Sequence, residues 1–279
     1  MCFPARIFLL PLCAFWIAEP LVAQLPFYTD DPAVTERGKW HFEFFNEFDL
    51  LQLQYPNTRQ NTANYKLNYG LPFNLELDVD SPYLAIFRAV GTPGSVGVGD
   101  TNLGIKWEFH KESARVPALG ASLYVEFPTG DSGQQLGSGL IDYWLNLIAQ
   151  KSLSDRTQIN TNLGYLFAGN TSTGVLGIQA VRGHVYTGGL SILHQFTARL
   201  TLGSEVYGGY TDSRGLARSQ FQGMLGGQYQ LRNGMTFDFG ILGGKYIASP
   251  RFGAQIGFSL DFPDVFHKPA SETHSFTMF

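Results

Sequence analysis

Six histidines are the side chains of this sequence best suited to act as general bases. They are His41, His110, His184, His194, His267 and His274. A hydrolase would place a serine beside one of them, but only His274 has a neighbouring serine, Ser275, and no G-x-S-x-G motif occurs. No H-x-x-x-H pair is present either. The sequence therefore predicts a protein that is not an enzyme and has no metal or other cofactor.

The acidic pair Asp30-Asp31, followed by Pro32, leaves two interpretations open. Neighbouring carboxylates could bind calcium. The same residues also suit a tight turn, because aspartate caps turns and proline fixes the backbone φ angle. We favour the turn.

Charged residues also recur at every second position of several segments, with apolar residues between them. We assign the polar positions to one surface that lines the lumen of a channel: Glu43, Glu47, Asp49, Lys66, Glu76, Asp78, Lys106, Glu108, Glu126, Asp142, Arg199 and Glu205. Acids outnumber bases in this set, so a water-filled lumen would favour cations. Alternatively, these charges pair across strands and only solvate the interior.

Strict alternation of apolar and polar residues is typical of strands with two different faces. It predicts strands at 40–50, 63–69, 73–80, 101–109, 119–127, 142–150, 159–167, 181–195, 198–210, 217–231, 235–247 and 252–262. About ten residues, tilted near 40°, rise roughly 25 Å, which is the height of the apolar band of an outer-membrane barrel. The fold predicted is therefore all-β, a closed antiparallel transmembrane β-barrel of about 12 strands.

The predicted connections alternate in length. Short turns are expected at 70–72, 113–116, 152–155, 195–197 and 232–234, and longer loops at 84–98, 130–139 and 169–180. Short periplasmic turns and long external loops are typical of outer-membrane barrels. With an even strand number, both ends of the barrel lie on the short-turn side.

The first residues are typical of a signal peptide. Arg6 precedes an apolar stretch at 7–17, and Ala23 provides a small residue for cleavage. Cys2 and Cys13 both lie in this segment, so a mature chain from Gln24 has no cysteine. We expect a signal peptide at 1–23, an N-terminal periplasmic segment at 24–38, the barrel at 39–262 and a C-terminal tail at 263–279. Whether the segment 24–38 plugs the lumen stays open.

The composition limits the kinds of partner that this protein can be expected to bind. The net charge is −4, charged residues make up 15% of the chain, and no basic cluster stands out, which argues against a nucleic-acid partner. A charged face packed inward without water would be costly, so the alternation favours a membrane barrel over a soluble barrel that binds an apolar ligand. We expect a bacterial outer-membrane location, with membrane lipid around the barrel.

The last predicted strand ends in QIGFSLDF, residues 255–262. Gln255, Gly257, Leu260 and Phe262 resemble the signal that the barrel assembly machinery recognises: a polar residue, a glycine, and two hydrophobic residues ending in an aromatic. The resemblance implies that this machinery is a partner and that the barrel closes at Phe262.

Longer stretches resemble the outer-membrane proteins labelled for the MetA pathway of phenol degradation. They include PFYTDDPAVTERGKWHFE from Pro26, GVGDTNLGIKWEF from Gly97 and LGASLYVEFPTGD from Leu119. The resemblance covers most of the mature chain. It implies a porin-like barrel for passive transport of small solutes, among them hydrophobic or aromatic compounds. A structural or adhesion barrel with a plugged lumen is the alternative, and an outer-membrane enzyme is the third, less favoured one.

Overall fold

The computed structural model describes residues 26–53, 57–168, 182–211, 219–232 and 234–263, and within these ranges nearly all regular structure is β-strand. The strands are β1 (Lys39–Leu50), β2 (Asn57–Leu71), β3 (Leu75–Arg88), β4 (Ser95–Val98), β5 (Thr101–His110), β6 (Ala118–Phe127), β7 (Asp142–Ser154), β8 (Thr157–Ala168), β9 (Gly183–Gln195), β10 (Leu200–Tyr210), β11 (Ser219–Arg232), β12 (Met235–Lys245) and β13 (Phe252–Pro263). Two short 3₁₀ turns, η1 (Pro72–Asn74) and η2 (Ser132–Gln134), lie between strands. In the described ranges, no helix is long and apolar enough to cross a membrane.

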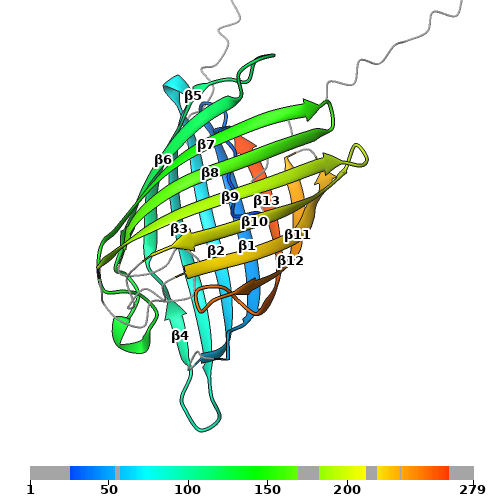
Figure 1. Cartoon of the computed structure of the whole chain (residues 1–279). Helices are drawn as coiled ribbons and strands as arrows, with labels where there is room; N and C mark the ends of the chain where they lie inside the picture. Colours follow the sequence, from blue (N-terminus) through cyan, green and yellow to red (C-terminus); the bar gives the residue numbers. More distant parts are fainter. Residues whose placement is uncertain (1–25, 54–56, 169–181, 212–218, 233, 264–279) are drawn as a thin grey trace, which may run out of the picture.

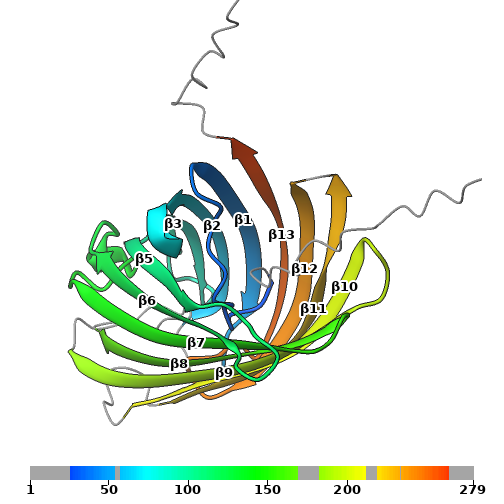
Figure 2. The same cartoon turned by 90° about the horizontal axis from the view of Figure 1, so that it is seen from above.

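The strands form one sheet that closes on itself (Figures 1 and 2). Closure joins β1 to β13 in antiparallel register, from Lys39 opposite Pro263 to Leu50 opposite Phe252. Strand β3 pairs with β5 over Leu75–Asp80 and with β4 over Tyr83–Ile86. Strands β4 and β5 thus act as one strand interrupted at 99–100, and the thirteen strands make twelve crossings of the wall. The predicted closed barrel of about twelve antiparallel strands is confirmed.

The two faces of the wall differ as the alternation predicts. On β8, Leu163 is 67% exposed on the outside, while its neighbour Asn162 is 3% exposed on the inside. On β6, Leu123 is 46% exposed, and Ser122 is buried at 2%. Apolar side chains facing out and polar ones facing in suit a barrel that is surrounded by hydrocarbon, in which every backbone group is paired within the wall.

One predicted loop is wrong. Residues 84–98 do not form a long loop, because β3 continues to Arg88 and pairs with β4, so that a hairpin extends the wall (Figure 1). Leu84 and Ile86 point inward there but pack against Leu136 of the 128–141 connection. An apolar cover on the inner face removes the polar alternation by which the strand would have been recognised. The remaining bounds shift by a few residues, and the predicted loop at 169–180 lies outside the described residues.

Both ends of the barrel wall lie at the short-turn end, since Lys39 pairs with Pro263. Gly38 also donates a backbone hydrogen bond to the Gly70 carbonyl, 2.8 Å away, beside the first hairpin turn. The predicted signal peptide at 1–23 and the predicted tail after Pro263 lie outside the described residues.

Candidate functional site in the barrel lumen

Most of the predicted lumen-lining residues do face inward. Eight are buried: Glu43, Glu47, Asp49, Glu76, Asp78, Lys106, Asp142 and Glu205. Lys66, Glu108 and Glu126 also lie on inward positions of their strands and are half-buried. Arg199 differs, because β10 begins only at Leu200 and Arg199 is exposed in the turn before it.

Burial of several of these residues has a specific cause: residues 26–35 lie inside the ring of strands, as the dark-blue segment of Figure 2 shows. Pro26, Phe27, Thr29, Asp31 and Pro32 are buried. The inner surface is therefore in contact with protein as well as solvent along this segment. We call residues 26–35 the lumenal segment.

Wall carboxylates accept hydrogen bonds from the lumenal segment. The Tyr28 hydroxyl lies 2.8 Å from both carboxylate oxygens of Glu47. The backbone N–H of Thr29 donates to Glu205, and that of Thr35 donates to Glu76 at 2.5 Å. Extended backbone inside the barrel has lost its hydrogen bonds to bulk water, so these carboxylates supply the acceptors it needs.

A lysine on the wall adds an ion pair to these hydrogen bonds. The Lys106 ammonium, whose side chain is 0% exposed, lies 3.0 Å from the Asp30 carboxylate. Asp30 and Asp31 also form turn contacts: Asp31 N–H donates to Asp30 and Ala33 N–H donates to Asp31, both at 2.8 Å. These local hydrogen bonds are the ones expected if Asp30 and Asp31 form a turn.

Inward glycines make room for the lumenal segment. A Cβ atom added at Gly226 would lie 2.8 Å from Pro26, and one at Gly203 would lie 2.9 Å from the Phe27 ring. Further along, an added Cβ at Gly189 would meet the Thr29 hydroxyl at 2.4 Å, and one at Gly120 would meet Pro32 at 3.1 Å. The glycines Gly120, Gly189, Gly203 and Gly226 form a track on which the segment rests, and a side chain at any of them would require the segment or the side chain to shift.

The deepest anchor is apolar. Phe27, 6% exposed, packs with Leu193, Met224 and Leu242, and Tyr28 lies against this cluster. The Tyr28 ring also lies 5.8 Å from that of Tyr207. Burial, together with the charges of Glu47 and Asp49, raises the pKa of Tyr28 well above its usual value. The phenol therefore keeps its proton and remains a donor to Glu47 at any physiological pH.

Several other lumenal acids have local partners. The Lys66 ammonium lies 3.8 Å from Glu43, which also faces His41 at 3.3 Å. The Tyr124 hydroxyl donates to Asp78 at 2.7 Å, and at the long-loop end Arg182 lies 2.7 Å from Asp142. Much of the acidic surplus is thus engaged within the chain, so the sequence alone overstates the charge that a passing ion would meet.

Apolar islands on the inner wall were not predicted. Leu166, Ala168 and Val185 form a buried cluster with Trp144 against it, and Leu84, Ile86 and Leu136 form another. Both lie toward the long-loop end of the barrel. A signal was present, because β9 carries apolar residues such as Val185 and Leu193 at its inward positions, which weakens its alternation. The lumen therefore combines polar and apolar surfaces.

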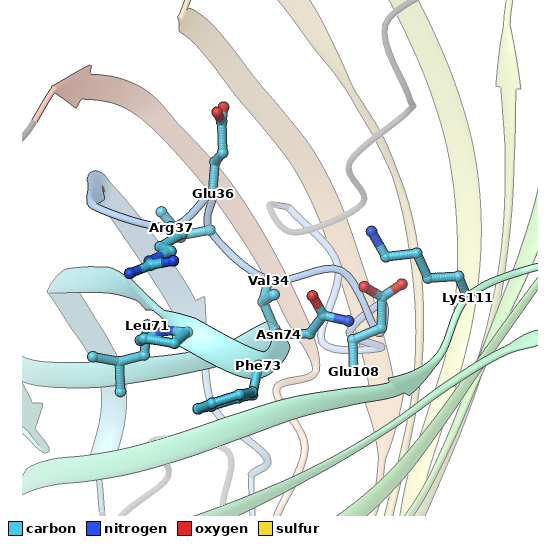
Figure 3. Close-up of a pocket in the computed structure, with 10 residues that line it drawn as sticks. Val34, Glu36, Arg37, Leu71, Phe73, Asn74, Glu108 and Lys111 are labelled. Atoms are coloured by element: carbon cyan, nitrogen blue, oxygen red, sulfur yellow. The ribbon is translucent and has the colours of Figure 1, made fainter.

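A pocket of about 610 Å³ opens where the N-terminal residues meet the first hairpin turn (Figure 3). It is lined by Val34, Thr35, Glu36, Arg37, Leu71, Pro72, Phe73, Asn74, Glu108 and Lys111. Figure 3 shows Val34, Asn74 and Glu108 gathered on one side of it. Charges of both signs surround the pocket, so it offers no single-sign site for an ion.

In the described part of the chain, no group of three or more His, Cys, Asp or Glu side chains could hold a metal ion. His194 contacts the Thr157 hydroxyl at 2.8 Å at the exposed outer surface, and His184 contacts Tyr165 at 2.6 Å. His274 and Ser275 lie outside the described residues.

The predicted assembly signal lies on the strand that closes the barrel. Gln255 and Gly257 face inward on β13, opposite Glu47 and Phe45 of β1. Leu260 and Phe262 occupy the outward positions, opposite Phe42 and Trp40. Recognition of these residues by the assembly machinery remains a prediction.

Comparison with known proteins gives one family and several solved structures of similar fold. The model of the family described as "Putative MetA-pathway of phenol degradation" matches residues 29–262. No curated protein matches the chain in sequence.

Among solved structures, the NanC porin superposes with a TM-score of 0.55 at 8% identity, over 78% of this chain and 98% of that one. The KdgM porin in complex with disordered oligogalacturonate superposes with a TM-score of 0.51 at 11% identity, over 80% of this chain and 99% of that one. The translocator domain of the autotransporter NalP from Neisseria meningitidis superposes with a TM-score of 0.51 at 10% identity, over 82% of this chain and 90% of that one. These matches show the fold, that of an outer-membrane barrel. Together with the apolar outward face of the closed wall, this fold places the protein in the bacterial outer membrane.

Proposed function

The chain belongs to the family of the MetA pathway of phenol degradation, and from this premise we propose that it is a passive conduit for small solutes, with hydrophobic or aromatic compounds among them. The observation that carries the proposal is a lumen with a built interior, polar along the lumenal segment and apolar toward the long loops. A purely structural barrel has no need of such a graded inner surface.

The apolar islands support the solute class. Small-molecule sites are lined mainly by apolar and aromatic side chains with a few polar groups among them. Trp144, Leu166 and Val185 provide such a surface at the long-loop end. The family description points the same way, since phenols are small aromatic compounds with one polar group.

Transport through this lumen requires the lumenal segment to move, because the segment occupies the inner surface between Gly120 and Gly226. Its contacts are side-chain hydrogen bonds, one ion pair and the Phe27 cluster, and none is a strand pairing of the wall. The segment can therefore leave without any loss of wall hydrogen bonds. Partners in this model are the solute, the surrounding lipid and the barrel assembly machinery.

A disulfide across the lumen tests the proposal. A Cβ atom added at Gly189 would lie 3.4 Å from the Thr29 Cβ, and disulfides join Cβ atoms roughly 3.5–4.5 Å apart. We expect Thr29→Cys/Gly189→Cys, refolded from residue 24 and placed in vesicles, to pass phenol or a small ion under reducing conditions and to be silent when oxidised. The background is clean, since both native cysteines precede residue 24.

The two single-cysteine variants serve as controls. The flux through each of them should be the same under oxidising and reducing conditions, because neither can form the disulfide. Equal flux in the locked and reduced double variant would refute movement of the segment as a condition of transport. Silence of the wild type and of both redox states, from protein shown to be folded, would favour the alternative of a plugged structural barrel. That alternative draws on the same observation, the close fit of Phe27 and Thr29 on the glycine track.

A further inference from the structure

Exposed cations gather on one arc of the long-loop rim. Arg59 lies at the start of β2, Arg251 directly before β13 and Lys245 at the end of β12, and all three side chains are exposed. The order of strands in the sheet is β2, β1, β13, β12, so the three residues occupy neighbouring strands. With strands about 4.8 Å apart, the arc is roughly 15 Å wide. We call Arg59, Lys245 and Arg251 the rim cations.

The rim cations have no acidic partner in the described part of the chain. None of the ion pairs found there includes them. Of the described carboxylates at this end, Asp49, Asp100 and Asp142 are buried. Asp131 is exposed in the connection between β6 and β7, which reaches the end of β3 through Leu136, but its carboxylate caps a turn through the N–H groups of Gly133 and Gln134. Among the described residues, these three positive charges thus have no counter-charge.

Aromatic rings hold two of these cations at the edge of the lipid-facing wall. The Arg59 guanidinium lies 5.3 Å from the Phe87 ring centroid, and the Lys245 ammonium lies 5.7 Å from that of Tyr246. Phe48 and Phe252, 40% and 49% exposed, lie on β1 and β13 between them. Cation–π contacts orient the charges while leaving their hydrogen-bond donors free. The arc therefore joins a cationic edge to an apolar, aromatic wall.

We infer that this arc is a binding site for a phosphorylated glycolipid of the outer leaflet, with the rim cations on its phosphates and its acyl chains along Phe48 and Phe252. Guanidinium groups bind phosphate oxygens through two parallel hydrogen bonds. An amphiphile whose phosphates meet the cations at the level where its chains meet exposed rings satisfies both parts of the surface. A free phosphate ion would satisfy only the cations.

The test measures how much lipid A remains with the refolded chain after detergent washing, with vesicles of phosphatidylcholine and diphosphoryl lipid A as the source. We expect Arg59→Gln/Lys245→Gln/Arg251→Gln to retain at least tenfold less lipid A than the wild type, and monophosphoryl lipid A to bind less than the diphosphoryl form. Inorganic phosphate at millimolar concentration should not compete. Because both leaflets of such vesicles are alike, the result does not depend on which rim faces outward.

The matched control is Arg156→Gln/Arg199→Gln/Arg232→Gln, which removes the same charge from exposed positions at the short-turn end. It should retain lipid A within about twofold of the wild type. Equal loss in both triple variants would overturn the inference in favour of a net-charge effect, and so would unchanged retention in the rim variant. Efficient competition by inorganic phosphate would overturn it in favour of a simple anion site. If the triple rim variant does not fold, Arg59→Gln and Lys245→Gln singly must each lower retention severalfold, or the inference fails.

Discussion

Truncation of Phe27 should release the lumenal segment while the wall stays intact. The Phe27 ring is 94% buried against Leu193, Met224 and Leu242, given its 6% exposure. Replacement of a packed phenylalanine by alanine costs about 3–5 kcal/mol. Because the ring is in water when the segment is detached, this whole cost falls on the attached state. At about 1.4 kcal/mol per factor of ten, even 3 kcal/mol raises the detached population roughly 100-fold.

Cysteine labelling reads this population directly. In a chain that starts at Gln24 and carries Thr29→Cys, the single thiol is buried when the segment is attached, since Thr29 is 0% exposed. We expect Phe27→Ala to raise the rate of maleimide labelling at residue 29 by about two orders of magnitude, in step with the detached population. The open probability in a planar bilayer should rise in parallel.

Phe73→Ala is the matched control, because Phe73 is 87% exposed in the first hairpin turn. It removes the same atoms without loss of packing and should leave the labelling rate unchanged. An unchanged rate in Phe27→Ala, with the heat-shifted gel mobility of a folded barrel, would show that Phe27 does not hold the segment.

Three further predictions concern the wall and its turns. Leu123→Arg places a charge on the lipid face and should cost about 2–4 kcal/mol and block membrane assembly, whereas the inward Glu126→Gln should not; equal membrane yields would contradict the assignment of faces. Phe262→Ala should lower assembly in cells severalfold but leave refolding in detergent unchanged, and equal losses in both would point to a packing role alone. Hydrogen bonds from Lys151 and Ser152 outweigh partial burial and lower the pKa of Glu112, so its stabilisation is present above the ordinary carboxyl pKa and is lost as the pH falls through the lowered one. Glu112→Gln should therefore cost less than about 1 kcal/mol at neutral pH, and this cost should shrink as the pH falls through the lowered pKa. Thermal melts over a series of pH values would show the change, and a cost that stays constant in acid would rule out the charge as its origin.

The wall was predictable because polar inward and apolar outward residues alternate along each strand. An inward Glu126 and an outward Leu123 differ in sequence parity, and a lipid exterior gives that parity one meaning. Loop 84–98 was mispredicted where this contrast vanishes, since Leu136 covers the inner side of Leu84 and Ile86.

The lumenal segment was not predictable in the same way. Its contacts join residues far apart in the chain, such as Thr29 and Glu205, and no local period announces them. Its imprint was nevertheless present in the sequence: Gly189, Gly203 and Gly226 fall on inward positions of successive strands, where long side chains would otherwise fill the lumen. Inward glycines on neighbouring strands therefore indicate that another part of the chain lies against them.

The direction in which the lumenal segment runs has a topological consequence. Pro26 contacts Gly226 within the barrel, whereas Gly38 lies at the short-turn end beside Gly70. In a mature chain that starts at Gln24, the residues inside the barrel lead to a free chain end, and the only covalent connection of the segment to the wall is its link to β1. Such a segment can enter or leave the barrel end first, as a single chain. An inserted loop would instead have to pass through the lumen as two chains side by side. Closure of β1 on β13 and seating of the segment are therefore separable events, and the barrel can form first and be filled afterwards.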